Sequence, residues 1–281
     1  GSALAKHVIA VRGAHDARIE NVHAYEARYD PLYIRGTRGL RISDSRFDRA
    51  GRNVISMVGT DEDFLFQNVY VGGIFGLFHF DIEPWFKPNG RHVRDGRVEN
   101  CTFDGRAAGT HGGDRWGAMF VLSGQHGLEN RGYTFERCHF RDIALRVRGI
   151  VPKVTLIGNT FAMRRRPHAL VRTRTTPVGE LRDADLCDNT ARLPTGTDRV
   201  NAGVQFTGET TIKDNTPEAF QHIDLKPTGD DPAWQEDHPR VDHPDKLTVR
   251  GVIERGEDGS RTVRMPLQWG YEFRLRDAKV L

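Results

Sequence analysis

Two carboxylates placed two residues apart form the pair in this chain best suited to acid–base chemistry. Asp81 and Glu83 lie in the segment 78–85, FHFDIEPW, where apolar and polar residues alternate with the period of a half-buried strand. On such a strand both acids face the same side, about 6.6–7 Å apart at Cα. Glycoside hydrolysis uses a carboxylic acid and a carboxylate, and inverting enzymes hold them about 6.5–9.5 Å apart. We therefore expect Glu83 to act as the acid and Asp81 as the base.

The chain around this strand is repetitive, with a period of about 21–25 residues where no insertion intervenes. Each repeat begins with an apolar-x-apolar segment, at 9–13, 32–36, 55–59, 80–84, 119–123, 145–149, 169–172 and 204–208. A second strand ends each repeat, at 19–22, 42–47, 65–69, 98–103, 135–140, 156–161, 186–190 and 212–216. Short strands at this period, with few helix signals, predict a β-solenoid whose stacked coils share one core.

Three of these segments carry a family resemblance. The sequences DPLY at 30–33, GRNVIS at 51–56 and FDIEP at 80–84 resemble segments of right-handed parallel β-helix proteins of the pectate-lyase-like superfamily. The resemblance covers roughly residues 7–216 and implies an all-β, right-handed parallel β-helix, a single-stranded solenoid of about eight coils. The superfamily includes hydrolases, lyases, epimerases and adhesins, so the fold alone leaves the activity open.

Stacking predicts which residues share a column, because equivalent residues of successive coils lie about 4.8 Å apart. The two outward columns of first strands are expected to contain Tyr33, Ser56, Asp81, Phe120, Arg146 and Gln205, and Arg35, Val58, Glu83, Leu122, Arg148 and Thr207. The acids are then flanked by Arg35 on one side and by Arg146 and Arg148 on the other. Tyr33 and Phe120 add aromatic surface for a bound sugar. Asp30 and Asn53, at the starts of neighbouring strands, add polar groups.

Three cysteines are present, and two of them fall in one column. Cys101 and Cys138 occupy equivalent positions beside Ser45, Asn159, Asn189 and Asn215. An odd number of widely spaced cysteines indicates neither a disulfide framework nor a metal site. We expect stacked, buried thiols and amides inside a solenoid turn, with no disulfide.

Enlarged turns follow the acid pair on the same face. They lie at 84–92, 104–116 and 124–127, and they contain Trp85, Trp116 and His126. Long turns on one face of a solenoid usually build its binding site, and exposed tryptophans suit stacking against a sugar ring. A weaker resemblance to polygalacturonase-type hydrolases rests on Gly124-Gln125-His126-Gly127 and Arg146-Val147-Arg148. It implies a cationic subsite at the two arginines, although no segment of the repeats matches that family's Asn-Thr-Asp and Asp-Asp motifs.

Two other functions stay open. A polysaccharide lyase or C5-epimerase acting on uronate polymers would use Arg146, Arg148 and either His126 or His79, with Asp81 and Glu83 free to hold Ca²⁺. A non-catalytic carbohydrate-binding, fibre or tail-spike β-helix would need no paired acids. The hydrolase requires no metal or cofactor, and a polysaccharide or oligosaccharide is the expected partner in every case.

Composition sets the remaining expectations. The 281 residues carry a net charge of +3 with acids interspersed throughout, which argues against nucleic-acid binding. No apolar run is long enough to cross a membrane. The fold resemblance favours an extracellular, virion or cell-surface location and allows a homotrimer. We expect a β-helix over residues 1–220 and, over 221–281, an irregular segment followed by a β-hairpin cap, with strands at 247–253 and 262–267.

Overall fold

Every described element of the computed structural model is a β-strand. The structure describes residues 6–74, 78–83, 92–105, 118–124, 130–162, 169–172, 180–192, 201–203, 205–215, 252–255, 261–266 and 272–276. Among these residues no helix occurs, and so none is long and apolar enough to span a membrane.

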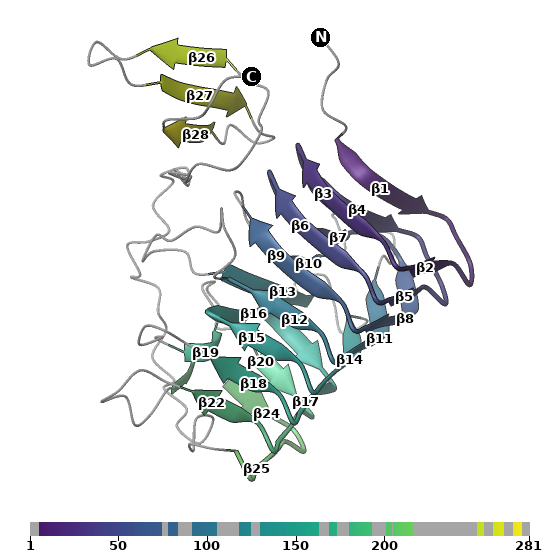
Figure 1. Ribbon diagram of the computed structural model, residues 1–281. Helices are drawn as coiled ribbons and strands as arrows, with labels where there is room; N and C mark the ends of the chain where they lie inside the picture. Colours follow the sequence, from purple (N-terminus) through teal and green to yellow (C-terminus); the bar gives the residue numbers. More distant parts are fainter. Residues whose placement is uncertain are drawn as a thin grey trace.

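Most strands belong to three parallel sheets (Figure 1). Sheet A contains β1 (His7–Arg12), β4 (Asp30–Arg35), β7 (Ile55–Met57), β10 (Phe80–Ile82), β13 (Ala118–Gly124), β16 (Ile143–Pro152), β19 (Ala169–Arg172) and β23 (Asn201–Gly203). In addition, β20 (Glu180–Arg182) pairs with β16, and β24 (Gln205–Thr207) pairs with β20. Sheet B contains β2 (Arg18–Glu20), β5 (Arg41–Ser43), β8 (Asp61–Gln67), β11 (Val93–Glu99), β14 (Arg131–Glu136), β17 (Val154–Ile157), β21 (Asp185–Cys187) and β25 (Thr211–Lys213). Sheet C contains β3 (His23–Ala27), β6 (Arg46–Ala50), β9 (Tyr70–Ile74), β12 (Thr102–Asp104), β15 (His139–Arg141), β18 (Thr160–Ala162) and β22 (Thr190–Arg192).

The chain visits the three sheets in a fixed rotation. From β1 to β18 the order is A, B, C, repeated six times, and each strand from β1 to β15 pairs with the strand three places later in the sequence. These pairings are parallel. This all-β architecture is compatible with the expected parallel β-helix.

The turn from sheet B to sheet C needs one residue with a positive φ angle in each coil. Asn21, Asp44, Asn68 and Asn100 hold it with φ angles of 55°, 49°, 55° and 52°. Asparagine and aspartate tolerate this left-handed conformation better than other residues with a side chain, because their short polar groups can bond locally. The recurring Asn and Asp of the sequence repeat therefore mark these turns.

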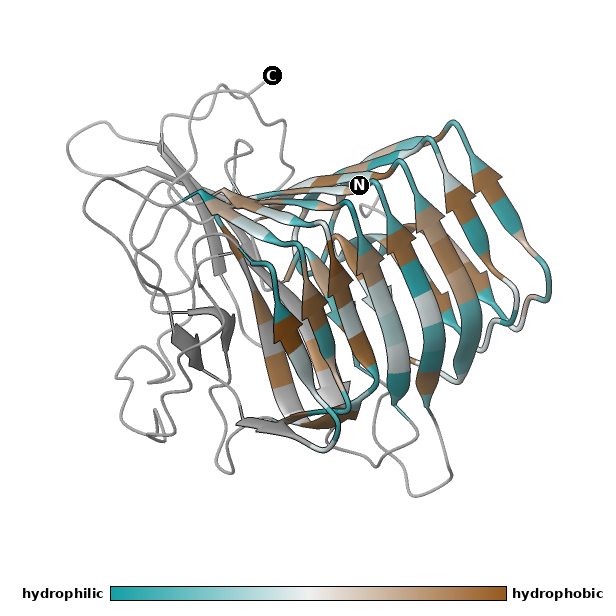
Figure 2. Ribbon diagram, turned by 90° about the horizontal axis from the view of Figure 1, so that it is seen from below, coloured by the Kyte–Doolittle hydropathy of each residue, from teal (hydrophilic) through white to brown (hydrophobic). Residues whose placement is uncertain are grey.

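Inward side chains form columns that run through the coils. Leu32, Ile55 and Phe80 are paired in register and fully buried, as the repeat predicts. In sheet C the rings of Phe103, Phe140 and Phe161 stack, with centroids 5.2 and 4.7 Å apart. Apolar and polar residues alternate along many strands (Figure 2), so each strand turns one side toward this core.

A polar column lies beside the phenylalanine stack. Asn159 Oδ1 accepts a hydrogen bond from the backbone N–H of Cys138 at 2.9 Å, and Asn189 and Asn215 repeat this pattern in the next two coils at 3.0 Å. Cys101 and Cys138 are buried free thiols in the same column. The predicted stack of thiols and amides is confirmed.

The expected register is wrong at two strands of the first-strand series. Phe120 pairs with Phe80 and Leu145, so its position belongs to an inward column and not to the column of Asp81. Val121 takes the place beside Asp81 that we assigned to Phe120. In addition, β24 pairs with β20 and not with the Leu145 segment.

The C-terminal strands form a separate antiparallel sheet. It contains β26 (Val252–Arg255), β27 (Arg261–Pro266) and β28 (Glu272–Arg276). The antiparallel pairing of β26 with β27 confirms the predicted hairpin. Its capping role and the division of the chain near residue 220 stay predictions.

Candidate functional site

Asp81 lies at the centre of β10, between two buried apolar residues. Phe80 and Ile82 face the core and are fully buried, so alternation places Asp81 on the other side of the sheet. Asp81 is nevertheless only 4% exposed. Glu83 follows at the next position on the same side, is partly buried, and donates its backbone N–H to Met57 O at 3.0 Å.

Asn53 connects Asp81 with the neighbouring coils. Its side-chain amide donates to Asp81 Oδ2 and to Ser56 Oγ, both at 3.0 Å. Its Oδ1 accepts the backbone N–H of Phe78 at 3.1 Å, and its own backbone N–H donates to Asp30 Oδ1 at 3.1 Å. Asn53 thus links three coils on the outer side of sheet A, and all of these polar side chains are buried.

Asp30 and Arg52 form the charged part of this cluster. Arg52 Nε donates to Asp30 Oδ1 at 2.9 Å, and Arg52 Nη2 donates to Asp30 Oδ2, which makes the pair bidentate. Burial alone would raise the pKa of Asp30, but its contacts with His7 and Arg52 outweigh burial and hold this pKa below its ordinary value. The charged form of Arg52 is further stabilised by Asp81.

Tyr33 borders the cluster on the side of the first coil. Its ring stacks on that of His7 with centroids 4.4 Å apart, and the guanidinium of Arg12 lies 5.5 Å from the tyrosine ring centre. His7 Nδ1 lies 3.2 Å from Asp30 Oδ2. Arg35, two residues beyond Tyr33, is exposed to solvent. Tyr33 therefore joins the cluster, whereas Arg35 lies outside it.

The pairing register places the two downstream arginines in relation to the acids. Asp81 pairs with Val121, and Val121 pairs with Arg146, so Arg146 is two coils from Asp81 in one column. Arg148 pairs with Ser123 in the adjoining outward column. At about 4.8 Å per coil, Arg146 is about 10 Å from Asp81 at Cα.

His79 is a further buried polar group, directly before β10. It precedes Asp81 by two residues and is fully buried. Neither ring nitrogen has a hydrogen-bond partner within the described part of the chain. Burial lowers the pKa of His79 to about 4, and the nearby backbone of Asp104 only partly opposes this. The imidazole is therefore neutral near pH 7.

Arg52 and Ser56 were absent from the site predicted from the sequence, although both lie in the segment 51–56 that carries the family resemblance. The polar residues of this segment, which lies directly before and within β7, could have indicated that Arg52 and Ser56 belong to the site. Trp85, Trp116 and His126, which we predicted to contact substrate, lie outside the described residues.

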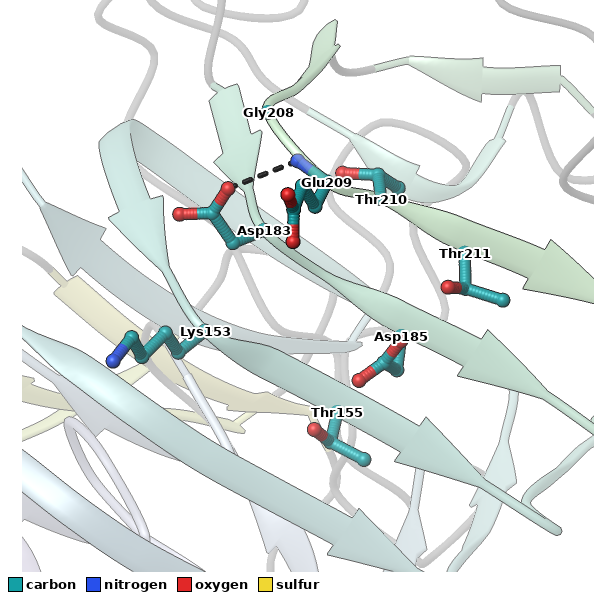
Figure 3. A pocket seen from close by; sticks show the side chains of 8 residues that line it. All are labelled: Lys153, Thr155, Asp183, Asp185, Gly208, Glu209, Thr210 and Thr211. Atoms are coloured by element: carbon teal, nitrogen blue, oxygen red, sulfur yellow. Dashed lines mark hydrogen bonds between the residues drawn. The ribbon is translucent and has the colours of Figure 1, made fainter.

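A polar hollow of about 680 Å³ lies on sheet B, far along the chain from this cluster (Figure 3). Thr155, Asp185 and Thr211 line it in register from three successive strands. At its edge Asp183 Oδ1 accepts the backbone N–H of Glu209 at 3.0 Å. Among the described residues no group of three or more His, Cys, Asp or Glu is placed to hold a metal ion, here or in sheet A.

No protein-family model matches the chain, and no curated protein matches it.

Proposed function

We propose that the three parallel sheets form a single right-handed β-helix, and that the outer side of sheet A around Asp81 is the active site of a glycoside hydrolase acting on a polysaccharide. Asp81 serves as the base that activates water, and Glu83 protonates the leaving oxygen. Asp81 lies in β10 and Glu83 directly follows the end of that strand. At an extended spacing of two residues the acids are about 6.6–7 Å apart at Cα, which suits the inverting separation.

The observation that carries this proposal is the hydrogen bond from the Asn53 amide to Asp81 Oδ2 at 3.0 Å. An amide N–H stabilises the ionised, accepting form of a carboxylate. The charge of Arg52, which interacts with Asp81, acts in the same direction. Glu83 has greater access to solvent than Asp81. The environments of the two acids therefore differ: Asp81 has an amide donor and a nearby positive charge, which suit a base, whereas Glu83 is less buried.

A non-catalytic carbohydrate-binding or fibre β-helix is the second candidate, and two observations favour it. The bidentate bond between Asp30 and Arg52 and the complete burial of Ser56 are also what a purely structural polar cluster would show. A lyase or epimerase draws its support from Arg146 in the Asp81 column. An extracellular or virion-surface location and a homotrimer accompany all three functions as predictions.

A screen of neutral and anionic polysaccharides, with product analysis, tests the hydrolase. We expect new reducing ends with no unsaturated product, and inversion at the anomeric carbon by NMR. Asp81→Asn and Glu83→Gln should each lower kcat by at least about 100-fold. The amide introduced by Asp81→Asn retains an oxygen that can accept from Asn53, so the fold should survive this change.

The matched control is Asp63→Asn, which alters a carboxylate whose side chain is 62% exposed and remote from the cluster. It should keep full activity. Cleavage that persists at the full rate in both acid variants would refute the assigned site, and an unsaturated product absorbing in the ultraviolet would establish a lyase instead. Binding without cleavage would support the non-catalytic helix.

A further inference from the structure

Cys101 and Cys138 lie directly opposite each other in adjacent coils. The pairs Glu99 with Glu136 and Thr102 with His139 bracket them, and the same sequence offset applies to both pairs. Parallel pairing places such positions about 4.8 Å apart at Cα, within the roughly 4.4–6.8 Å that a disulfide spans.

One of the two thiols already points toward the other. Cys138 Sγ donates to Val98 O at 3.3 Å, so this thiol leans toward the coil that contains Cys101. Cys101 Sγ leans away, toward the coil before it, where it accepts the backbone N–H of Val69 at 3.4 Å. A rotamer change at Cys101 would turn its sulfur toward Cys138. A bridge also needs Cβ atoms about 3.5–4.5 Å apart, so the two coils would have to close by about 1 Å or less.

We propose that Cys101 and Cys138 form a stabilising disulfide between adjacent coils when the chain folds in the presence of a small-molecule disulfide such as oxidised glutathione. The bridge closes the loop 102–137, which contains β12, β13 and β14. This inference does not depend on the proposed function. It departs from the sequence expectation of no disulfide, because it concerns folding in the presence of an oxidant, whereas the structure holds the two thiols unlinked.

The chemistry is thiol–disulfide exchange in two steps. The thiolate of Cys138 attacks one glutathione sulfur, which forms a mixed disulfide and releases one glutathione thiolate. The thiolate of Cys101 then attacks Cys138 Sγ, which forms the protein disulfide and releases the second glutathione. The two protein thiols lose two protons and two electrons, and the glutathione disulfide is reduced to two glutathione thiols.

The folded state itself disfavours this reaction, so folding is the stage at which it occurs. Both thiols are fully buried. Burial raises the pKa of the Cys101 thiol, and the adjacent Cys138 thiol raises it further. Little reactive thiolate is then present in the native protein.

Cys187 provides an internal control for geometry. It pairs with Ile157, and Ile157 pairs with Glu136, so Cys187 lies two coils beyond the coil of Cys138. The resulting separation is at least about 9.6 Å, too far for a disulfide without backbone movement. If the three cysteines paired at random, disulfides containing Cys187 would form as readily as the bridge between Cys101 and Cys138. If the native fold selects the pair, disulfides containing Cys187 should be rare.

The test is to refold the denatured, reduced chain in a buffer of reduced and oxidised glutathione, trap the remaining thiols, and map the linked peptides by mass spectrometry. We expect the link between Cys101 and Cys138 to exceed both links to Cys187 together by at least about tenfold. Cys187→Ser should form the same bridge, and Cys101→Ser should keep its two remaining thiols reduced. Because the bridge constrains the unfolded chain, the oxidised protein should melt at least about 5 °C above the reduced protein.

Two results would overturn the proposal. One is a refolded protein that keeps all three thiols, or that links Cys187 as often as the other two cysteines. The other is a bridged protein that melts at or below the temperature of the reduced form, because the strain of closing the two coils would then exceed the gain.

Discussion

Asp30 is the buried charge that the site cluster depends on most directly. It is fully buried and bound in a bidentate pair by Arg52. Asp30→Asn removes the negative charge and leaves the guanidinium in place, which should lower the free energy of unfolding by about 3–5 kcal/mol. Urea denaturation measures this loss.

The control for this prediction is Asp63→Asn, which breaks a solvent-exposed pair with Arg41. An exposed pair contributes about 0–1 kcal/mol, so this variant should stay close to the parent protein. Equal losses in the two variants would contradict the assigned importance of the buried pair.

His79 predicts an acid sensitivity with a definite sign. Its pKa is about 4 in the folded chain, against an ordinary value of 6.5. The unfolded chain therefore binds a proton in a range where the folded chain does not, and stability falls as the pH drops from about 6.5 to about 4. The loss across this range is roughly 3 kcal/mol from this group. Denaturation curves at pH 7 and pH 4 measure it.

His79→Leu should remove this component, so the variant loses roughly 3 kcal/mol less between the two pH values than the parent does. His139→Asn changes an exposed histidine and should leave the pH dependence unaltered. If the leucine variant were as acid-sensitive as the parent, the buried imidazole would not be the cause.

Individual residues differ in how well the sequence foretold their positions. Asn53 and Asp81 were placed on the same side of neighbouring strands because polar residues recurred at defined places in a repeat, and the structure joins them by a hydrogen bond. Arg52 was missed because a turn arginine next to a strand normally points into solvent, and only the structure shows Asp30 within its reach. Strand alternation placed Ser56 on the outer side of the sheet but could not show that it is fully buried there, in contact with Asn53.

At the scale of elements, the neighbouring strands β8, β11 and β14 pack two aromatic rings around a glycine of the middle strand. Gly96 of β11 lies in register between Phe64 and Tyr133, whose rings are 6.5 Å apart at their centroids. A Cβ atom at Gly96 would lie 1.9 Å from the Phe64 ring, and that ring is itself buried. Gly96→Ala should therefore lower the free energy of unfolding by about 1–3 kcal/mol through overpacking.

A double-mutant cycle checks the cause of this loss. Phe64→Leu replaces the obstructing ring with a smaller side chain, so Gly96→Ala should cost markedly less in that background. Denaturation of the parent, both single variants and the double variant gives the coupling energy. Additive losses would mean that the methyl group and the Phe64 ring do not compete for the same space.

The error at β13 has a physical origin in its sequence. Residues 118–122 are all apolar, so no alternation distinguishes the side that faces the core. We placed Met119 inward, whereas pairing with Phe80 and Leu145 places Phe120 at that position. In β4, β7 and β10 a polar residue separates two apolar residues, so alternation shows which side faces the core. There the predicted columns agree with the observed pairs.

At the scale of the whole molecule, the repeat made the all-β arrangement in parallel sheets predictable, because each repeat has the same strands to pack. Each coil needs an inward apolar pair, a left-handed turn and a polar residue that bonds to the coil before it. A recurrence of these three features is visible in one sequence. The polar side chains gathered over sheet A, such as Asp30, Asn53 and Asp81, lack this property, because each comes from a single position and not from a feature that every coil repeats.

The first coil predicts where the stack should open most easily. Within the described residues, β1, β2 and β3 each pair with a strand on one side only. Their inward residues Ile9, Val11 and Ile19 are only partly buried, whereas the corresponding residues of the second coil are buried. Opening the first coil therefore breaks a single interface between coils, while opening an internal coil breaks two.

Hydrogen exchange followed by mass spectrometry tests this gradient. Peptides covering residues 7–27 should exchange at least about tenfold faster than peptides covering residues 55–74, which have a coil on each side. The second coil, residues 30–50, should fall between them. Equal protection across the three regions would show that another surface covers the first coil in solution. The contacts between that surface and the first coil would then contribute to the stability of the first coil.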